Sequence, residues 1–365
     1  MTTTMRQQDG AEDVVIAGAG VAGLAVALGL HRKGVRSVVL ESSPVLRTSG
    51  FAIMAWTNAF RALDALGVGD TIRTKHAQIQ GYSTVPHFSF SPCWLSVRCL
   101  SFFLVLYYYW CTFRVRVMSS STGEVAREMD LRVQGKLWLG LAKLSDSGRT
   151  ATRGHARYPG GHGFEHKMMQ FSGQGFRAGM LPCNDTDVYW FFTWSPPSRP
   201  DGKEDDDRRS PAAMKQFVLA ELRSINAPAK VLEAVERSEM NDVLVAPLRY
   251  RPPLSLLSAS ISKGNVCVAG DLAQGACVAL EDAVVLARCL GDAIVGDGTE
   301  TVEAALRRYA GIRRWRCAQV IAASYVVGLV QQSDHAAVRF LRDRLLSGVL
   351  AKGLLMMPDY DCGTL

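Results

Sequence analysis

The first regular pattern of apolar positions in the chain runs from Asp13 to Ser42. The short apolar run Val14–Ala17 is typical of a parallel strand that is buried on both faces. Residues 21–33 are rich in Ala and Leu with apolar residues at helical spacing, and residues 35–40 form a second apolar run. The pattern therefore predicts a strand, a helix and a second strand, with a sharp turn between the first strand and the helix.

That turn carries the motif G-x-G-x-x-G. Gly18 permits the tight turn, Gly20 lets the backbone approach a pyrophosphate, and Gly23 lets the helix pack against the strand. Val21 and Ala22 lie at the helix N-terminus, which offers N–H donors and the positive end of the helix dipole to phosphate groups. We therefore predict that these five residues contact a dinucleotide. A glycine turn without a ligand is the alternative interpretation.

Glu41 ends the second strand. A carboxylate at this position accepts hydrogen bonds from both hydroxyl groups of a ribose, and it repels a 2′-phosphate. The predicted site therefore favours FAD or NAD over NADP as the nucleotide that is held.

A second strand–turn–helix pattern lies near the other end of the chain, in Gly264–Leu290. An apolar run predicts a buried strand that ends at the pair Gly270-Asp271. Gly275 follows, and it opens a predicted helix that carries the pair Glu281-Asp282.

The remaining patterns predict a second structural unit and a helical end. Residues 151–196 contain short strands separated by Gly and Asn-Asp turns, which favours an antiparallel sheet. Residues 214–238 show apolar spacing typical of a helix buried on one side, and the chain from Thr301 onwards is predicted to be helical.

Residues 86–117 fit neither unit. The 15 residues from Cys99 to Phe113 are uncharged and crowded with aromatic and β-branched side chains. A spanning helix needs about 20 apolar residues, so a membrane segment is the less favoured interpretation. In soluble protein an exposed run of this kind would be prone to aggregation. We interpret it as an anomalous insert that was not selected as protein sequence, as if noncoding sequence had been translated.

Composition narrows the class of protein. A length of 365 residues with 48% hydrophobic residues favours a globular protein of two domains. The net charge of +7 comes from scattered Lys and Arg rather than a basic run interleaved with aromatic residues, so we expect anionic nucleotides or substrates and no nucleic acid. The nine cysteines form no C-x-x-C pair, which predicts no metal site and no disulfide framework. The polar first dozen residues resemble no targeting segment, so a cytoplasmic location is expected.

Several of these motifs together resemble the FAD-dependent aromatic-ring hydroxylases. Within that family, residues 42–70, the pattern of Tyr309, Arg313 and Arg316, and the ending DYDCGTL are most similar to the plant monooxygenases related to salicylate hydroxylase and zeaxanthin epoxidase. The resemblance implies FAD contacts for Arg47, which would lie near the flavin nucleotide, and for Asp271, which would bind the ribityl chain. It also implies that Gly275 opens a helix aimed at the pyrimidine end of the flavin.

The resemblance implies a function as well. In that family NAD(P)H transiently reduces the flavin, which reacts with O₂ and delivers one oxygen atom to a small aromatic or olefinic substrate. The cofactor carries this reaction, so no catalytic side chain is predicted. The fold implied is α/β: a Rossmann-like FAD/NAD(P)-binding domain, an interleaved substrate domain with a mixed or antiparallel sheet, and a C-terminal helical segment.

The domain ranges follow from the resemblance. We assign residues 11–85 and 256–300 to the FAD-binding domain, 86–117 to the insert, 118–255 to the substrate domain with parts missing, and 301–365 to the C-terminal helices.

Two departures from the family pattern affect the predicted function. The D-G motif that touches FAD and the reduced nicotinamide is not recognisable, and Asp271 is followed after two residues by Gln274, without the usual His-Pro loop. These departures leave open a non-catalytic FAD-binding remnant of the family. A second alternative, an NAD-dependent dehydrogenase, is permitted by the G-x-G-x-x-G motif together with Glu41.

Overall fold

The structure is a computed structural model. It describes residues 13–42, 55–76, 79, 81–85, 115–118, 125–129, 139–141, 143–173, 175–195, 210–258, 260–270, 275–331 and 359–365.

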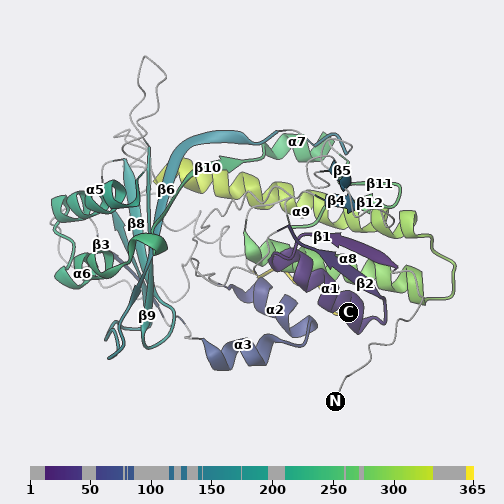
Figure 1. Ribbon diagram of the computed structural model, residues 1–365, viewed down its shortest axis with the longest axis horizontal. Helices are drawn as coiled ribbons and strands as arrows, with labels where there is room; N and C mark the ends of the chain where they lie inside the picture. Colours follow the sequence, from purple (N-terminus) through teal and green to yellow (C-terminus); the bar gives the residue numbers. More distant parts are fainter. Residues whose placement is uncertain are drawn as a thin grey trace.

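Strand β1 (Val14–Ala17), helix α1 (Val21–Arg32) and strand β2 (Ser37–Leu40) form the predicted β-α-β unit. The two strands pair in parallel, with the residues of β1 in register with those of β2. The buried side of α1 packs against helix α8 (Ala276–Val295), and both helices belong to one apolar core. Figure 1 shows α1 and α8 side by side, next to the two strands.

The burial expected for the two predicted apolar strands is wrong. Val15 in β1 is 61% exposed, because among the described residues β1 pairs with β2 alone and the sheet has only two strands. The strand before Gly270 is reduced to β12 (Val266–Cys267), which pairs antiparallel with β11 (Ser262–Lys263). Val266 is exposed. The apolar sequence up to Gly270 therefore continues beyond the strand.

A six-stranded sheet forms the second unit, and its mixed character agrees with the prediction. In spatial order its strands are β10 (Leu244–Tyr250), β6 (Ser145–Arg157), β9 (Asp187–Trp194), β8 (Phe176–Pro182), β7 (Lys167–Ser172) and β3 (Gly81–Val85). Neighbouring strands are antiparallel except for β3 and β7, which are parallel. Strand β3 comes from the range that the sequence assigns to the FAD-binding domain.

Helices α5 (Pro211–Ser224) and α6 (Ala229–Arg237) cover one face of this sheet. The sequence pattern continues through both helices. The chain nevertheless breaks between them, since Asn226 has a φ of 52° and Pro228 caps α6. A proline at this position cannot continue the preceding helix.

Side chains alternate between the two faces of the sheet because successive residues of a strand point to opposite sides. Trp190 packs with the helices α5 and α6, whereas Tyr189 and Phe191 belong to a separate cluster on the other face. Arg153 is paired with Phe191 in the register, and the Arg177 guanidinium lies 5.5 Å from the Phe191 ring centroid. We call this second face the inner face, because it is turned away from α5 and α6 and towards the β-α-β unit (Figure 1).

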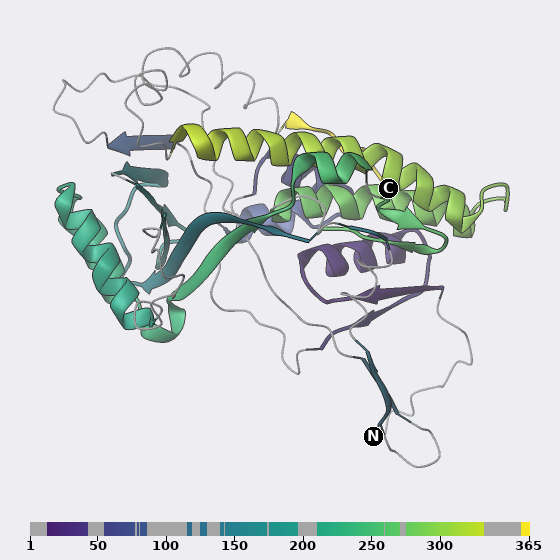
Figure 2. The ribbon, with the colours of Figure 1, turned by 90° about the horizontal axis from the view of Figure 1, so that it is seen from above.

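Further described elements lie outside the β1-α1-β2 unit and the six-stranded sheet. They are α2 (Thr57–Ala65), α3 (Gly69–Lys75), β4 (Val115–Met118), β5 (Val125–Met129), the short 3-10 helix η2 (Met240–Asp242), α7 (Pro253–Ser258) and α9 (Val302–Gln331). Helix α9 packs on α7 and α8, and Figure 2 shows it extending from the β-α-β unit towards the six-stranded sheet.

No helix in the described part of the chain combines the length and apolar character needed to cross a membrane. Of the predicted insert, residues 86–114 lie outside the described residues, and residues 115–117 belong to β4, which pairs antiparallel with β5.

Candidate functional site

The glycine turn after β1 has the geometry that its sequence predicts. Gly18 has a φ of +109°, and its N–H donates a hydrogen bond to the carbonyl oxygen of Leu40 in β2 at 2.8 Å. A side chain at Gly23 would fall on the carbonyl oxygen of Gly18, so only glycine allows the helix to approach the turn this closely. The turn is thus fixed to both strands and to α1.

The N-terminus of α1 has no side-chain cap among the described residues. Gly20 is the N-cap residue, and the first turn has no acidic residue. A Cβ atom added at Gly20 would meet no heavy atom of the described residues within 4 Å. An uncapped helix N-terminus of this kind, with Val21 and Ala22 in its first turn, suits phosphate groups.

Glu41 reaches the glycine turn from the end of β2. Its Oε2 atom accepts a hydrogen bond from the N–H of Ala19 at 2.8 Å. The carboxylate thus lies beside the turn that would hold a pyrophosphate, at the place where the sequence predicts contacts with a ribose.

The second glycine motif meets the first one directly. A Cβ atom at Gly270 would lie 2.5 Å from the Cβ of Ala22 in the first turn of α1, and 3.5 Å from the Cβ of Ala279 in the first turn of α8. Gly275, with a φ of +115°, is the N-cap of α8 and, as at α1, no side chain of the described residues caps the helix. The N-termini of α1 and α8 therefore meet at Gly270.

These observations fit a dinucleotide such as FAD. Two uncapped helix N-termini, the absence of side chains at Gly20 and Gly275, and a carboxylate at the end of β2 provide groups for phosphates and for a ribose. Within the described part of the chain, Gly18, Gly20, Val21, Ala22, Gly23, Glu41 and Gly275 are thus placed around two adjoining helix ends. Arg47 and Asp271 lie outside the described residues, so their predicted FAD contacts stay predictions.

A buried cluster of charged groups lies behind this meeting point. We call Glu281, Asp282, Arg313 and Arg316 the charged cluster. Glu281, Asp282 and Arg313 are fully buried, and Arg316 is 8% exposed. Burial raises the pKa of the Asp282 carboxyl, while the charge of Arg313 and the hydrogen bond from the Gly270 amide act in the opposite direction.

In the sequence, Arg313 and Arg316 contribute only to a family resemblance. In the structure, Arg313 contacts Glu281 and Asp282, and Arg316 contacts Glu281. Asn58 of α2 donates to Oε1 of Glu281 at 2.6 Å, and no sequence signal points to that contact.

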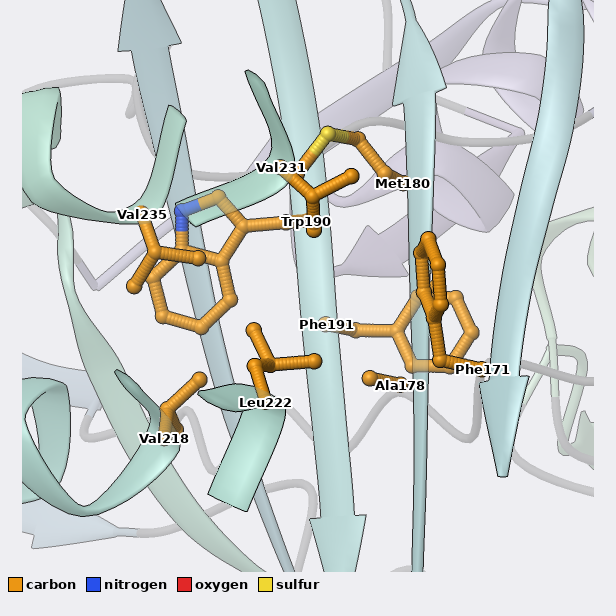
Figure 3. A pocket seen from close by; sticks show the side chains of 10 residues that line it. Phe171, Ala178, Met180, Trp190, Phe191, Val218, Leu222, Val231 and Val235 are labelled. Carbon is orange, nitrogen blue, oxygen red and sulfur yellow. The ribbon is translucent and has the colours of Figure 1, made fainter. Parts of the chain in front are cut away.

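A small apolar cavity lies between the six-stranded sheet and helices α5 and α6, which cover the face opposite to the inner face. Its volume is about 10 Å³, which leaves room for about one water molecule. Figure 3 shows Trp190 with Val218, Leu222, Val231 and Val235 around it. The cavity is too small for an aromatic substrate, and a packing gap in the core explains it.

The chain also resembles known proteins. Residues 11–113 match the model of the FAD binding domain family. The chain is 34% identical to Monooxygenase 2 of Arabidopsis thaliana, in an alignment that covers 98% of this chain and 99% of the relative. That alignment has 427 positions, so it includes positions at which this chain of 365 residues has a gap.

Solved structures share the fold. Klebsiella pneumoniae HpxO complexed with FAD and uric acid has a TM-score of 0.62 at 16% identity, over 94% of this chain and 96% of that one. A salicylate hydroxylase substrate complex has a TM-score of 0.59 at 16% identity, over 94% and 97% of the two chains. Because its identity to Monooxygenase 2 extends over nearly the full length of both chains, the protein belongs to the family of FAD-dependent monooxygenases that includes the aromatic-ring hydroxylases.

Proposed function

We propose that this monooxygenase binds FAD where the N-termini of α1 and α8 meet, and that it uses NAD(P)H and O₂ to oxygenate a small aromatic or olefinic molecule. The observation that carries the proposal is the contact between Gly270 and Ala22, which joins the two glycine motifs into one site. A single glycine turn would suit the pyrophosphate of any dinucleotide. Two helix N-termini that meet at one point suit FAD, whose pyrophosphate can lie at one helix end while its flavin lies at the other.

The residues of this site would each have a part in holding FAD. Gly20, Val21 and Ala22 would present backbone N–H groups to the pyrophosphate. Glu41 would accept hydrogen bonds from a ribose. When bound, FAD supplies the redox chemistry that activates O₂, while the protein orients the substrate and excludes water.

The inner face of the six-stranded sheet is the proposed substrate side. It carries Tyr189 and Phe191, both nearly fully buried, and the Phe191 ring lies over the position of Gly179, where a side chain would overlap it. Aromatic side chains of this kind suit flat apolar molecules. Uric acid and salicylate, which the similar structures are named for, are small molecules of that shape.

An absorbance spectrum of the purified chain tests FAD binding, since one bound flavin per chain gives flavin bands near stoichiometry. Turnover is tested by NADH and NADPH oxidation with hydroxybenzoates, together with incorporation of oxygen from isotopically labelled O₂ into the product. Substrate-dependent incorporation supports the proposal, and flavin-loaded protein that transfers no oxygen to any substrate of this class contradicts the proposed turnover.

A second candidate function is an FAD-binding protein without turnover. It is supported by the missing D-G and His-Pro motifs and by the gaps in the alignment with Monooxygenase 2. Yellow protein that oxidises no NAD(P)H with or without aromatic substrates would favour this candidate. The NAD-dependent dehydrogenase considered from the sequence is set aside, because the chain belongs to a family of FAD-dependent monooxygenases.

A further inference from the structure

The segment Val268–Gly270 leads directly into the proposed site, yet no strand of the described residues pairs with it. Strand β12 ends at Cys267, and the one backbone hydrogen bond that the described residues make to this segment runs from the Val268 N–H to the carbonyl oxygen of Ile261 at 3.0 Å. Its position therefore depends on other contacts.

Val268 and Ala269 pack against the apolar core, and two buried side chains add hydrogen bonds to the segment. Asp282 of α8 accepts a hydrogen bond from the Gly270 N–H through Oδ2 at 2.9 Å. Tyr309 of α9 donates its hydroxyl hydrogen to the carbonyl oxygen of Val268 at 3.0 Å. Both side chains are fully buried, so water cannot replace either hydrogen bond without a rearrangement.

Asp282 is itself fixed by the charged cluster. Its Oδ1 atom accepts from Nε of Arg313 at 2.6 Å, and Nη2 of Arg313 donates to Glu281 at 2.7 Å. Nη2 of Arg316 donates to the other Glu281 oxygen at 2.9 Å. Two carboxylates therefore face two guanidinium groups, and their charges balance.

The C-terminal segment closes the charged cluster from outside. The Tyr360 ring centroid lies 4.4 Å from the guanidinium carbon of Arg316 and 5.3 Å from that of Arg313. Nη1 of Arg288 donates to the carbonyl oxygens of Cys362 and Thr364 at 2.8 and 2.9 Å, which holds the segment in place.

Stability alone does not account for such a cluster. Moving an ion out of water costs several kcal/mol, and apolar residues of similar size often stabilise a core as well or better. A buried carboxylate does provide what an apolar side chain cannot, namely an acceptor at a fixed point for the Gly270 N–H.

We propose that Asp282 and Tyr309 are positioning residues, which hold Val268–Gly270 where Gly270 meets the first turns of α1 and α8, beside the proposed FAD site. Neither side chain is proposed to touch the cofactor. The inference rests on the proposed FAD site, and it adds that FAD affinity depends on two side chains behind that site.

The test is a titration of flavin-free protein with FAD, followed by flavin fluorescence, alongside the Tm of each flavin-free variant. Asp282→Ala removes the acceptor and is expected to weaken FAD binding about tenfold, and Tyr309→Phe removes one hydrogen bond and is expected to weaken it about threefold. Tyr309→Phe keeps the aromatic ring and removes only the hydroxyl group. If Asp282→Ala does not fold, the FAD affinity of Tyr309→Phe therefore tests the proposal.

Two controls separate positioning from general destabilisation. Tyr158→Phe removes a buried hydroxyl group in the six-stranded unit, and Leu222→Ala opens a cavity under α5; both side chains are nearly fully buried. The proposal expects both controls to bind FAD as the wild type does, although Leu222→Ala lowers the Tm.

Three results overturn the inference. In the first, the folded Asp282 and Tyr309 variants bind FAD with wild-type affinity. In the second, Leu222→Ala loses as much affinity as these variants do, which would make the effect one of stability. In the third, the wild type itself binds no FAD, and the proposed site fails together with the inference.

Discussion

Gly270 packs against Ala22, and this contact joins two segments separated by most of the chain. The space between them admits no side chain, since a Cβ atom at Gly270 would lie 2.5 Å from the Cβ of Ala22. The first turn of α1 and the approach to α8 are therefore held at a fixed separation, and the proposed FAD site depends on that separation.

Gly270→Ala should consequently lower both stability and FAD affinity. Overpacking costs about 1–3 kcal/mol, and the φ of +78° at Gly270 adds strain for any other residue. Ala22→Gly in the same chain should restore part of the stability, because it removes the atom that clashes. Urea unfolding of the two single variants and the double variant measures this coupling. Strictly additive effects would show that the two residues do not constrain each other.

Arg313→Ala should be among the most destabilising single changes on α9. It leaves Asp282 and Glu281 buried with less compensating charge, which costs about 3–5 kcal/mol in comparable pairs. Arg307→Ala is the matched control on the same helix, because Arg307 forms an exposed pair with Glu303 at 3.5 Å. Such surface pairs contribute about 0–1 kcal/mol. Urea unfolding that gives similar losses for both variants would contradict the assigned role of the charged cluster.

Cys277 reports on the first turn of α8 through its pH dependence. Burial raises the pKa of the Cys277 thiol to about 11, so it is protonated at neutral pH. We expect slow alkylation of Cys277 by iodoacetamide at pH 8 and faster alkylation as the pH rises towards 11, read by peptide mass spectrometry.

The same pKa shift predicts a change in stability. Since the folded pKa is above the unfolded value of about 8.5, this thiol's contribution to stability is complete below pH 8.5 and is lost as the pH rises through the folded pKa. For the alkylation experiment, the protein in urea provides the reference rate. Alkylation at pH 8 that is as fast in the folded protein as in urea would contradict the raised pKa of Cys277.

The sequence predicted the local units well because their signals are local. The G-x-G-x-x-G turn, α1, β2 and the start of α8 after Gly275 follow from short-range spacing and glycine geometry. The break between α5 and α6 was not predicted. Asn226 and Pro228, on which the break depends, lie within one continuous apolar pattern.

Features that depend on distant neighbours were not predictable in this way. The exposure of Val15 depends on which strands lie beside β1, and an apolar run cannot report that. The contacts of Asp282 with Gly270 and Arg313, and of Tyr360 with Arg316, join residues far apart in sequence. Their motifs were visible in the sequence, but their partners were not.

The central claim is that FAD binds over Gly20, and a comparison of two alanine variants tests it most directly. Gly20→Ala fits the flavin-free fold, because its methyl group meets none of the described residues within 4 Å and the φ of −73° at Gly20 suits alanine. Gly311→Ala is the matched control, since Gly311 lies in α9 and a methyl group there also meets no described residue within 4 Å. Any loss of stability in Gly20→Ala should stay near the helix-cap effect of about 1 kcal/mol.

The measurement is the FAD titration of the flavin-free wild type and both variants, with the Tm of each as the check on folding. We predict one FAD per chain for the wild type and for Gly311→Ala, and at least about a hundredfold weaker binding for folded Gly20→Ala, which corresponds to about 2.7 kcal/mol. Equal affinity in all three proteins, or no binding to the wild type, would contradict the account.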